Sequence, residues 1–367
     1  MNIVLVGSAD RCGIYEYSQI LLDGFRQVGL QVRYLGVRNQ DNHDLARQLK
    51  QVRAEDKVII FEYEPGIFDL RGLVGQILRL RLRGKRVLLS IHEIEPARYS
   101  QYQQIIWRIN QPTRYTGFLE MMRLVWASFD VARRYLFFRS YLFFLGWLPQ
   151  VIIVHSSKAR KNVRLINAHP QKVAFIPYLV KCLEGNQAEI RASLNLPQDK
   201  FAFIIAGFIF RRKQIIETIQ QLPDDSELWI VGTVSEYDPD YLEEIHSYLA
   251  QNKHRGTVRF FHDYDRMEQY LLAADVSVLY YKEVYQSGIA AHSIGAGKPC
   301  IFSNLAGFTE YHQAGLVVQG PETLGHALRE IQQKEVYRRL QANTLRLREH
   351  FAPAVIAKQY AEIAVNL

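Results

Sequence analysis

Short apolar runs alternate with amphipathic stretches through the first half of the chain. Between the runs, apolar side chains recur at helical spacing, as in the stretch that carries Tyr17, Leu21 and Phe25. Strands that alternate with helices in this way predict a doubly wound parallel sheet, an α/β architecture. The runs with the length of buried strands are residues 3–6, 32–35, 58–61 and 86–91.

The same alternation starts again after a polar linker at residues 181–199. Because 367 residues are many for one α/β domain, we predict two Rossmann-like domains, residues 1–180 and 181–345. A last helical segment, residues 346–367, is expected to pack back on the N-terminal domain. The remaining runs of strand length are residues 151–154, 173–176, 201–206, 228–231, 258–261, 276–281 and 300–302.

The stretch 276–302 reads as strand, polar turn, helix, glycine turn and strand. Ser287 and Gly288 begin the helix, and Glu283 and Gln286 lie just before it. Free N–H groups beside a carboxylate and an amide suit an anionic ligand rich in hydroxyls. Ordinary α/β architecture produces the same pattern, so the stretch alone leaves both interpretations open.

Polar residues also cluster where the first strands end: Gly13, Glu62, Glu64, His92 and Glu93. Ligands of doubly wound sheets lie beyond the carboxyl ends of the strands. We therefore favour a site here over a purely structural role for these residues.

A second candidate site follows the strand at residues 201–206. Gly207 allows a close turn, and Arg211, Arg212 and Lys213 precede a helix predicted over residues 215–222. Positive charge before a helix start suits a diphosphate, although a basic loop can also be merely solvated. The chain has neither GxGxxG nor GxxxxGK[ST], so a common dinucleotide site and a P-loop are not supported.

Residues 104–148 break the α/β pattern with aromatic, Leu and Arg residues. Arg139 interrupts the most apolar part, so no run reaches the roughly 20 residues that cross a bilayer. This composition is typical of helices in the membrane interface. Buried core or oligomer packing is the alternative.

The composition of the chain bears on its cellular compartment and on the charge of its partners. The three cysteines form no metal-binding spacing, which fits a reducing cytosol. The N-terminal apolar run is expected to be a first strand and not a signal peptide. The net charge of +8 indicates an anionic partner of unspecified kind.

Taken together, seven segments resemble GT-B glycosyltransferases of family 4 in order and spacing: residues 12–29, 61–68, 91–96, 153–163, 175–180, 206–213 and 285–299. The resemblance implies two Rossmann-like domains that face a central cleft. It also implies retaining transfer of a sugar from a nucleotide-sugar donor to a hydroxyl, without a metal ion or other cofactor.

The resemblance also implies roles for individual residues. Lys213, with Arg211 or Arg212, would neutralise the leaving diphosphate, while His92 and Glu283 would bind the donor sugar. The other implied donor-binding residues are Gly13, Gly207, Gln286, Ser287, Gly288 and His292.

The chain departs from the family pattern at the donor site. A second glutamate is expected eight positions after Glu283, where Ala291 stands, and His292 could contact the ribose instead. Phe208 replaces an expected arginine. We favour an active enzyme over a degenerate, non-catalytic subunit that binds partner enzymes.

In the resembling family the N-terminal domain binds the acceptor, and residues 104–148 lie there. We therefore expect a lipid-linked or saccharide acceptor and a peripheral enzyme on the cytoplasmic face of the membrane. A nucleic-acid partner is not expected, because the basic residues form no continuous patch.

Overall fold

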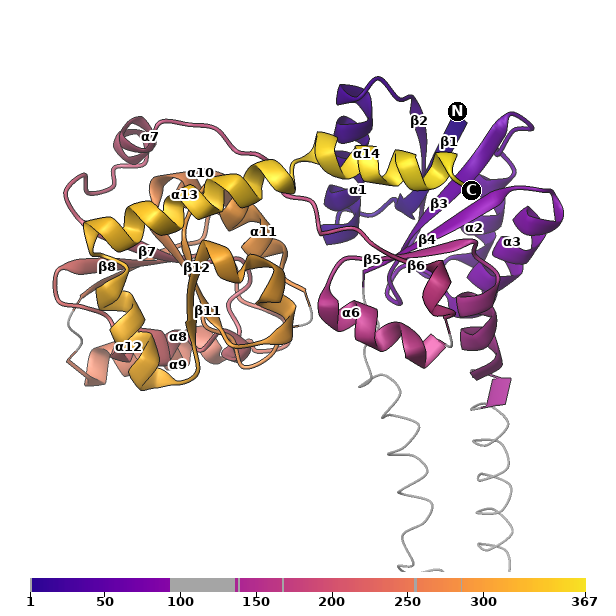
Figure 1. The fold of residues 1–367 in the computed structure, drawn as a ribbon. Coiled ribbons are helices and arrows are strands. Elements are labelled where there is room, and N and C mark those ends of the chain that lie inside the picture. The colour runs from indigo at the N-terminus through magenta and orange to yellow at the C-terminus, as the bar shows by residue number, and fades with distance from the viewer. Residues whose placement is uncertain (1, 93–135, 138, 167, 254–255, 285) are drawn as a thin grey trace, which may run out of the picture. The chain divides into compact units, whose positions relative to one another are not determined.

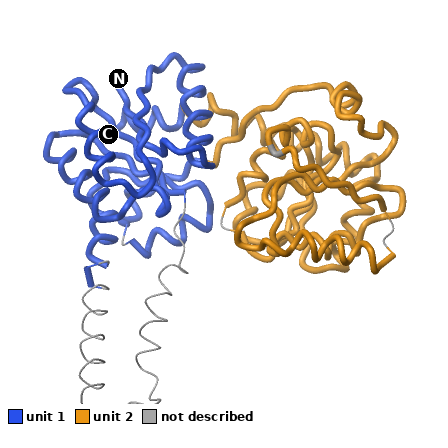
Figure 2. Tube along the Cα trace, turned by 180° about the vertical axis from the view of Figure 1, so that it is seen from behind, with its two compact units in different colours: residues 1–176, 358–367 blue, residues 177–357 orange. Residues whose placement is uncertain are grey.

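The computed structural model describes residues 2–92, 136–137, 139–166, 168–253, 256–284 and 286–367. The chain forms two compact units (Figure 2). The first contains Met1–Ile176 and Lys358–Leu367, so the end of the chain belongs to the unit in which it begins. The second contains Pro177–Ala357.

The first unit is built on a parallel six-stranded sheet in the order β2-β1-β3-β4-β5-β6 (Figure 1). After its first residue β1 is buried throughout, as expected of a parallel strand that is covered on both faces. The strands are β1 (Asn2–Ser8), β2 (Val32–Val37), β3 (Asp56–Tyr63), β4 (Arg86–Ile91), β5 (Val151–Val154) and β6 (Val173–Phe175).

Side-chain caps begin several helices of this unit. Asp69 accepts a hydrogen bond from the N–H of Gly72, and Ser156 accepts one from Ala159, so Ser156 is the cap residue. Residues 136–137 and 139–147 are also helical. The named helices are α1 (Gly13–Gln27), α2 (Asn42–Leu49), α3 (Leu70–Leu82), α6 (Ser157–Asn162), η1 (Val163–Ile166), η2 (Pro170–Lys172) and α14 (Pro353–Val365), which begins in the second unit and belongs to the first from Lys358 on.

The second unit repeats the architecture with the strand order β12-β11-β10-β7-β8-β9, again parallel. Its strands are β7 (Phe201–Ala206), β8 (Ser226–Val231), β9 (Thr257–Phe261), β10 (Val276–Leu279), β11 (Cys300–Ser303) and β12 (Gly315–Val318). Its helices are α7 (Gln187–Ser193), η3 (Arg211–Lys213), α8 (Ile215–Gln220), α9 (Tyr241–Gln251), η4 (Tyr264–Arg266), α10 (Met267–Ala273), α11 (Gly288–Gly295), η5 (Ala306–Ala314), α12 (Pro321–Glu330) and α13 (Lys334–His350).

The predicted α/β class with parallel sheets is confirmed, and two element ends differ for local reasons. The strand predicted to reach residue 281 ends at Leu279, because the Ser303 hydroxyl hydrogen-bonds both the N–H and the C=O of Tyr281 in place of a ladder. The helix predicted to reach residue 222 ends at Gln220, since Pro223 disfavours helix in the residue before it. Among the described residues no helix is both long enough and apolar enough to span a bilayer.

Candidate functional site

Two adjacent strands of the second unit, β7 and β10, end at the same edge of the sheet. Gly207 follows β7 with φ of +82°, a conformation that favours glycine. A Cβ at this position would lie 2.9 Å from Cδ1 of Ile289 and 3.2 Å from Nζ of Lys213. The glycine therefore lets the first turn of α11 and the Lys213 ammonium lie close to the strand end.

Lys213 is the most unusual residue of this edge, because its ammonium is buried. Nζ donates a hydrogen bond to the carbonyl of Ala206 and lies 5.2 Å from the ring centre of Phe210 and 6.0 Å from that of Tyr281. None of its interactions among the described residues is with a carboxylate. Burial, and after it the charge of Arg212, lower the pKa of Lys213 to about 7.

The two arginines of the basic loop differ in their surroundings. Arg211 is exposed and pairs with Asp238 at 3.4 Å and with Glu244 at 2.5 Å. The Arg212 guanidinium lies 4.1 Å over the ring of Phe210. The backbone carbonyl of Arg212 accepts a hydrogen bond from the N–H of Lys282. The loop thus holds Arg212 beside Lys213, whereas Arg211 is already neutralised by carboxylates.

The predicted helix start after β10 is present as α11. The Ser287 hydroxyl caps it by accepting a hydrogen bond from the N–H of Ala290 at 3.2 Å. A Cβ at Gly288 would meet no atom within 4 Å, so open space borders the first turn. Glu283 is exposed and Gln286 half-buried on the preceding loop.

Ala291, the position at which the family pattern has a second glutamate, faces the core and not the solvent. Ala291 is 4% exposed and belongs to the core, so a side chain there would point inward. The next residue, His292, is partly exposed, and its Nδ1 lies 3.6 Å from Oε1 of Glu268. Glu268 in turn pairs with Lys181 at 2.8 Å. The structure therefore places His292, and not Ala291, on the open side of α11.

The first unit gathers its polar side chains at the ends of β3, β4 and β5. Glu62 is paired in register with Ser90, and the Ser90 hydroxyl lies within hydrogen-bond distance, 2.6 Å, of Oε2 of Glu62. Nε2 of His92 lies 2.6 Å from the same oxygen. All three side chains are buried.

The network continues through Ser90 into two further elements. The Ser90 hydroxyl lies 2.9 Å from Nε2 of His155, which follows β5, and 2.9 Å from the hydroxyl of Tyr360 on α14. Tyr360 also lies 3.2 Å from the hydroxyl of Tyr17 on α1. Nδ1 of His155 lies 2.9 Å from the carbonyl of Ile176 and, facing an acceptor, must donate. One serine thus joins three strands to the C-terminal helix.

Burial shifts the ionisable members of this network toward their neutral forms. It raises the pKa of Glu62 to about 7, against the opposing effects of His155 and Ser90. It lowers the pKa of His92 to about 3, and burial together with His92 lowers that of His155 to about 3. The network is therefore electrically neutral between about pH 3 and about pH 7.

Ligand atoms of Glu62, His92 and His155 lie within 4.8 Å of one another, a spacing at which a metal ion could be held. The same oxygen and nitrogens already hydrogen-bond within the network. We therefore treat the cluster as a hydrogen-bond network.

The structure brings most predicted residues into two groups. Gly207, Arg212, Lys213, Ser287 and Gly288 lie at one edge of the second sheet, while His92 joins the network of the first unit. Gly13 begins α1, where an added Cβ would meet no atom within 4 Å. Glu93 lies outside the described residues.

Sequence reasoning assigned no role to Ser90, His155, Tyr17 or Tyr360. The available signal was a polar residue inside an otherwise apolar strand, Ser90, two positions before His92.

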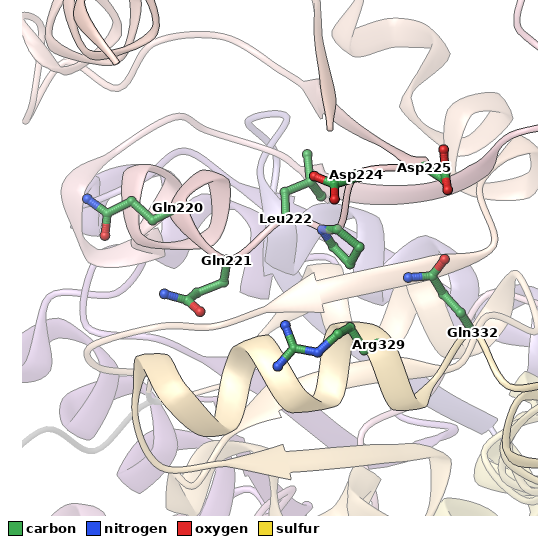
Figure 3. A pocket seen from close by; sticks show the side chains of 8 residues that line it. Gln220, Gln221, Leu222, Asp224, Asp225, Arg329 and Gln332 are labelled. Atoms are coloured by element: carbon green, nitrogen blue, oxygen red, sulfur yellow. The ribbon is translucent and has the colours of Figure 1, made fainter. Parts of the chain in front are cut away.

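A polar cavity of about 480 Å³ lies elsewhere in the second unit (Figure 3). Gln221, Asp224 and Asp225 line it just before β8 begins, and Arg329 of α12 faces them. This is the amino end of β8, whereas the residues above lie at carboxyl ends. The cavity is therefore separate from the candidate site.

Comparison with protein families identifies the second unit. Residues 205–334 match the family model described as glycosyl transferases group 1. Residues 205–334 of the second unit match a glycosyltransferase domain. The match confirms the predicted enzyme class, and it covers Gly207, the basic loop and α11.

Solved structures of similar fold match the chain over nearly its whole length. HepE from Anabaena in complex with UDP-glucose is 13% identical over all of both chains, with a TM-score of 0.69. Sucrose-phosphate synthase from Thermosynechococcus elongatus is 16% identical, with a TM-score of 0.66, over 100% of this chain and 98% of that one. WaaG, a glycosyltransferase involved in lipopolysaccharide biosynthesis, is 14% identical, with a TM-score of 0.58, over 98% and 99%. These likenesses confirm the GT-B fold. None of the curated proteins compared by sequence matches the chain.

Proposed function

We propose that this glycosyltransferase moves a sugar from a nucleotide-sugar donor to an acceptor hydroxyl, with retention of anomeric configuration. The observation that carries the proposal is Lys213, a buried ammonium beside the first turn of α11 that has no carboxylate partner among the described residues. Such a cation, next to free helix N–H groups, suits a diphosphate.

In the proposed reaction the acceptor oxygen bonds to the anomeric carbon on the face from which the diphosphate leaves. The bond from that carbon to the phosphate oxygen breaks, and the acceptor's proton passes to the leaving phosphate. Lys213 and Arg212 stabilise the negative charge that develops on the diphosphate. We propose that the reaction therefore uses no metal ion and no other cofactor.

We further propose that His92 and Glu283 bind hydroxyls of the donor sugar and that His292 contacts the ribose. The 3.6 Å approach of Glu268 to His292 supports the last role, because it places a carboxylate beside the ring. The open space at Gly13 and Gly288 supports close approach of phosphates to the backbone.

A thermal-shift screen of nucleoside diphosphates and nucleotide sugars tests the donor class. Because HepE was crystallised with UDP-glucose, UDP-sugars are the first choice. We expect one nucleotide family to raise the melting temperature and to support transfer or slow hydrolysis. If no nucleotide sugar binds the intact protein, the enzyme proposal is wrong.

We propose that the acceptor is lipid-linked and that the helical residues 139–147 meet the cytoplasmic membrane surface. Leu142 and Leu145 of this segment are buried, whereas Phe143 is 46% and Phe144 42% exposed. Upstream, Phe137 is 55% exposed, and Phe138 lies outside the described residues. This exposure favours an interfacial role over core packing.

Cationic side chains border the same surface. A Cβ at Gly146 would lie 2.1 Å from the carbonyl of Ile166, so the helical segment packs closely on η1. Arg160, Lys161 and Arg164 are exposed on α6 and η1, the two consecutive helices of which η1 makes this contact. Aromatic and cationic groups together suit anionic lipid headgroups.

Sedimentation with anionic vesicles at low salt tests this attachment. The paired substitutions Phe143→Ser and Phe144→Ser should reduce the bound fraction, whereas Tyr237→Ser, at an exposed aromatic of the second unit, should not. Wild-type protein that stays wholly in the supernatant would contradict the membrane proposal.

The second candidate is a non-catalytic subunit of glycan assembly. Phe208, exposed where the family pattern has an arginine, and the buried Ala291 favour it. Tight partner binding without nucleotide-sugar binding would support this function and exclude the first.

A further inference from the structure

The hydrogen-bond network around Glu62 has few hydrogens available for its contacts. Three short contacts need a hydrogen each: Glu62 to Ser90, Glu62 to His92, and Ser90 to His155. Ser90 supplies one hydrogen, and the ring of His155 has already committed the hydrogen on Nδ1 to the carbonyl of Ile176.

Two proton arrangements complete all three contacts without leaving net charge in the interior. In the first, Glu62 is protonated and donates to Ser90, and Ser90 donates to the neutral His155. In the second, Glu62 is ionised and accepts from Ser90, while an imidazolium at His155 donates to Ser90. Either way, one mobile proton is shared between Glu62 and His155 through the serine hydroxyl.

Both arrangements have the same consequence for His92. Its Nε2 must donate to Oε2 of Glu62, because the acid hydrogen of Glu62 is either committed to Ser90 or absent. If Glu62 donated to His92 instead, completing the other contacts would require a buried imidazolium beside a protonated acid, which is a net charge in a fully buried place. The carboxylate thus fixes which ring nitrogen of His92 bears hydrogen.

We propose that Glu62 is a positioning residue that holds His92 as the Nε2–H tautomer and so makes Nδ1 an acceptor. Any hydrogen bond at Nδ1 must then come from a donor group, such as a hydroxyl of the donor sugar. The last point rests on the proposed function, in which His92 binds that sugar, whereas the tautomer itself does not. The raised pKa of Glu62 is consistent with the first arrangement below pH 7.

The groups that face the shared proton come from every element around it. Tyr360 of α14 donates to Ser90, because the serine's own hydrogen is used elsewhere, and Tyr17 of α1 can donate to Tyr360. The C-terminal helix is therefore coupled to the tautomer of His92 through one hydroxyl. Tyr34, whose hydroxyl donates to the carbonyl of Ser8 at 2.6 Å, is a further titratable group near Glu62.

Long-range ¹H–¹⁵N spectra of histidine-labelled protein, recorded without donor, test the tautomer. Loss of one ring signal set in His92→Gln assigns the residue. We expect His92 to carry hydrogen on Nε2 in the wild type, and a mixture of both tautomers in Glu62→Leu. Hydrogen on Nδ1 in the wild type would overturn the proposal, as would an unchanged single tautomer in Glu62→Leu or a stoichiometric metal ion in the purified protein.

Glu62→Gln keeps the test open if the leucine variant does not fold. Glutamine retains an oxygen acceptor for His92 but carries no acid proton. It should keep the Nε2–H tautomer and abolish the pH-dependent shift of the His155 ring signals near neutrality; a shift that persists would overturn the shared proton. Glu227→Gln, at a buried carboxylate bonded to Trp229 and Arg259 in the second unit, is the matched control and should change neither signal.

Donor affinity separates this proposal from the proposed function. If both hold, Glu62→Leu weakens binding of the donor sugar about tenfold, the cost of one lost hydrogen bond to a positioned group. The reference is UDP, which lacks the sugar and should bind both proteins equally. If the wild type has the Nε2–H tautomer but Glu62→Leu and His92→Gln both bind the donor sugar as tightly as the wild type, His92 does not belong to the donor site. Glu62 would still be the residue that fixes the tautomer of the His92 ring.

Discussion

Both units bury ionisable side chains, but they satisfy them in opposite ways. In the first unit, Glu62, His92 and His155 hydrogen-bond one another through Ser90 and together carry no net charge. In the second, Lys213 is buried against a carbonyl and aromatic rings, with no carboxylate partner among the described residues. A closed network stabilises the fold that contains it, whereas an uncompensated cation costs stability and is explained by a ligand that brings the opposite charge.

Lys213→Met should have the largest effect of the substitutions considered, and the effect should be on activity and not on stability. Loss of the positive charge that stabilises the leaving diphosphate is expected to reduce kcat about 10²- to 10³-fold, as for removal of one stabilising donor in other enzymes. The melting temperature should stay level or rise, since a buried charge has been replaced by an apolar chain of similar length.

The matched control is Lys282→Met, a lysine whose backbone N–H donates a hydrogen bond to the carbonyl of Arg212 in the same basic loop. Its side chain is exposed, and activity should remain near that of the wild type. Equal losses in both variants would remove Lys213 from its proposed role.

Acidification should destabilise the closed network. His92 and His155 have pKa values lowered from 6.5 to about 3, so the unfolded chain binds their protons first and stability falls as pH drops from about 6.5 to about 3. Urea unfolding followed by circular dichroism between pH 4 and 8, a range chosen to span about two units on either side of 6, measures this loss. A urea concentration at half-unfolding that stays constant as the pH is lowered from 6.5 to 4 would contradict this expectation.

Glu62 contributes with the opposite sign. Its pKa is raised from 4.5 to about 7, so its contribution is fully present below pH 4.5 and is lost as pH rises through 7. The wild type should therefore gain stability relative to Glu62→Gln as pH falls from 7 to 4.5. The two histidines outweigh this gain, and the absolute stability still declines in acid.

Tyr360→Phe is the smallest of these changes. It removes the hydroxyl that contacts Ser90 and Tyr17 but keeps the ring that packs edge-on against Phe25. We expect a loss of about 1 to 2 kcal/mol in the free energy of unfolding, since buried hydroxyls lose partners. A neutral substitution would show that α14 is held by apolar packing alone.

The sequence predicted the fold well because strand and helix periods are local properties of the chain. The places of Gly207, Lys213 and Ser287 in the fold could also be predicted, since each lies directly after a strand or before a helix. The network of the first unit was found only at His92. Ser90 lies on β4 and His155 directly follows β5, while Tyr360 lies 270 residues from Ser90. The pairing of the strands and the return of the C-terminal helix to the first unit are therefore needed to predict these contacts.

The position of the missing glutamate shows the same limit. Counting eight residues from Glu283 leads to Ala291, which the structure buries in the core. A count along the chain does not say which face of α11 is open, and here the open face carries His292.

Proton uptake on donor binding tests the central claim, that the buried amine of Lys213 supplies a positive charge to the donor diphosphate. Calorimetric titration of UDP-glucose at pH 8, in two buffers of different ionisation enthalpy, counts the protons, and the diphosphate of this ligand does not itself titrate there. With a Lys213 pKa of about 7, the free amine is mostly neutral at that pH and should take up about one proton per donor bound. Lys282→Met should keep this uptake and Lys213→Met should lose it. Donor binding without proton uptake in the wild type would contradict the account.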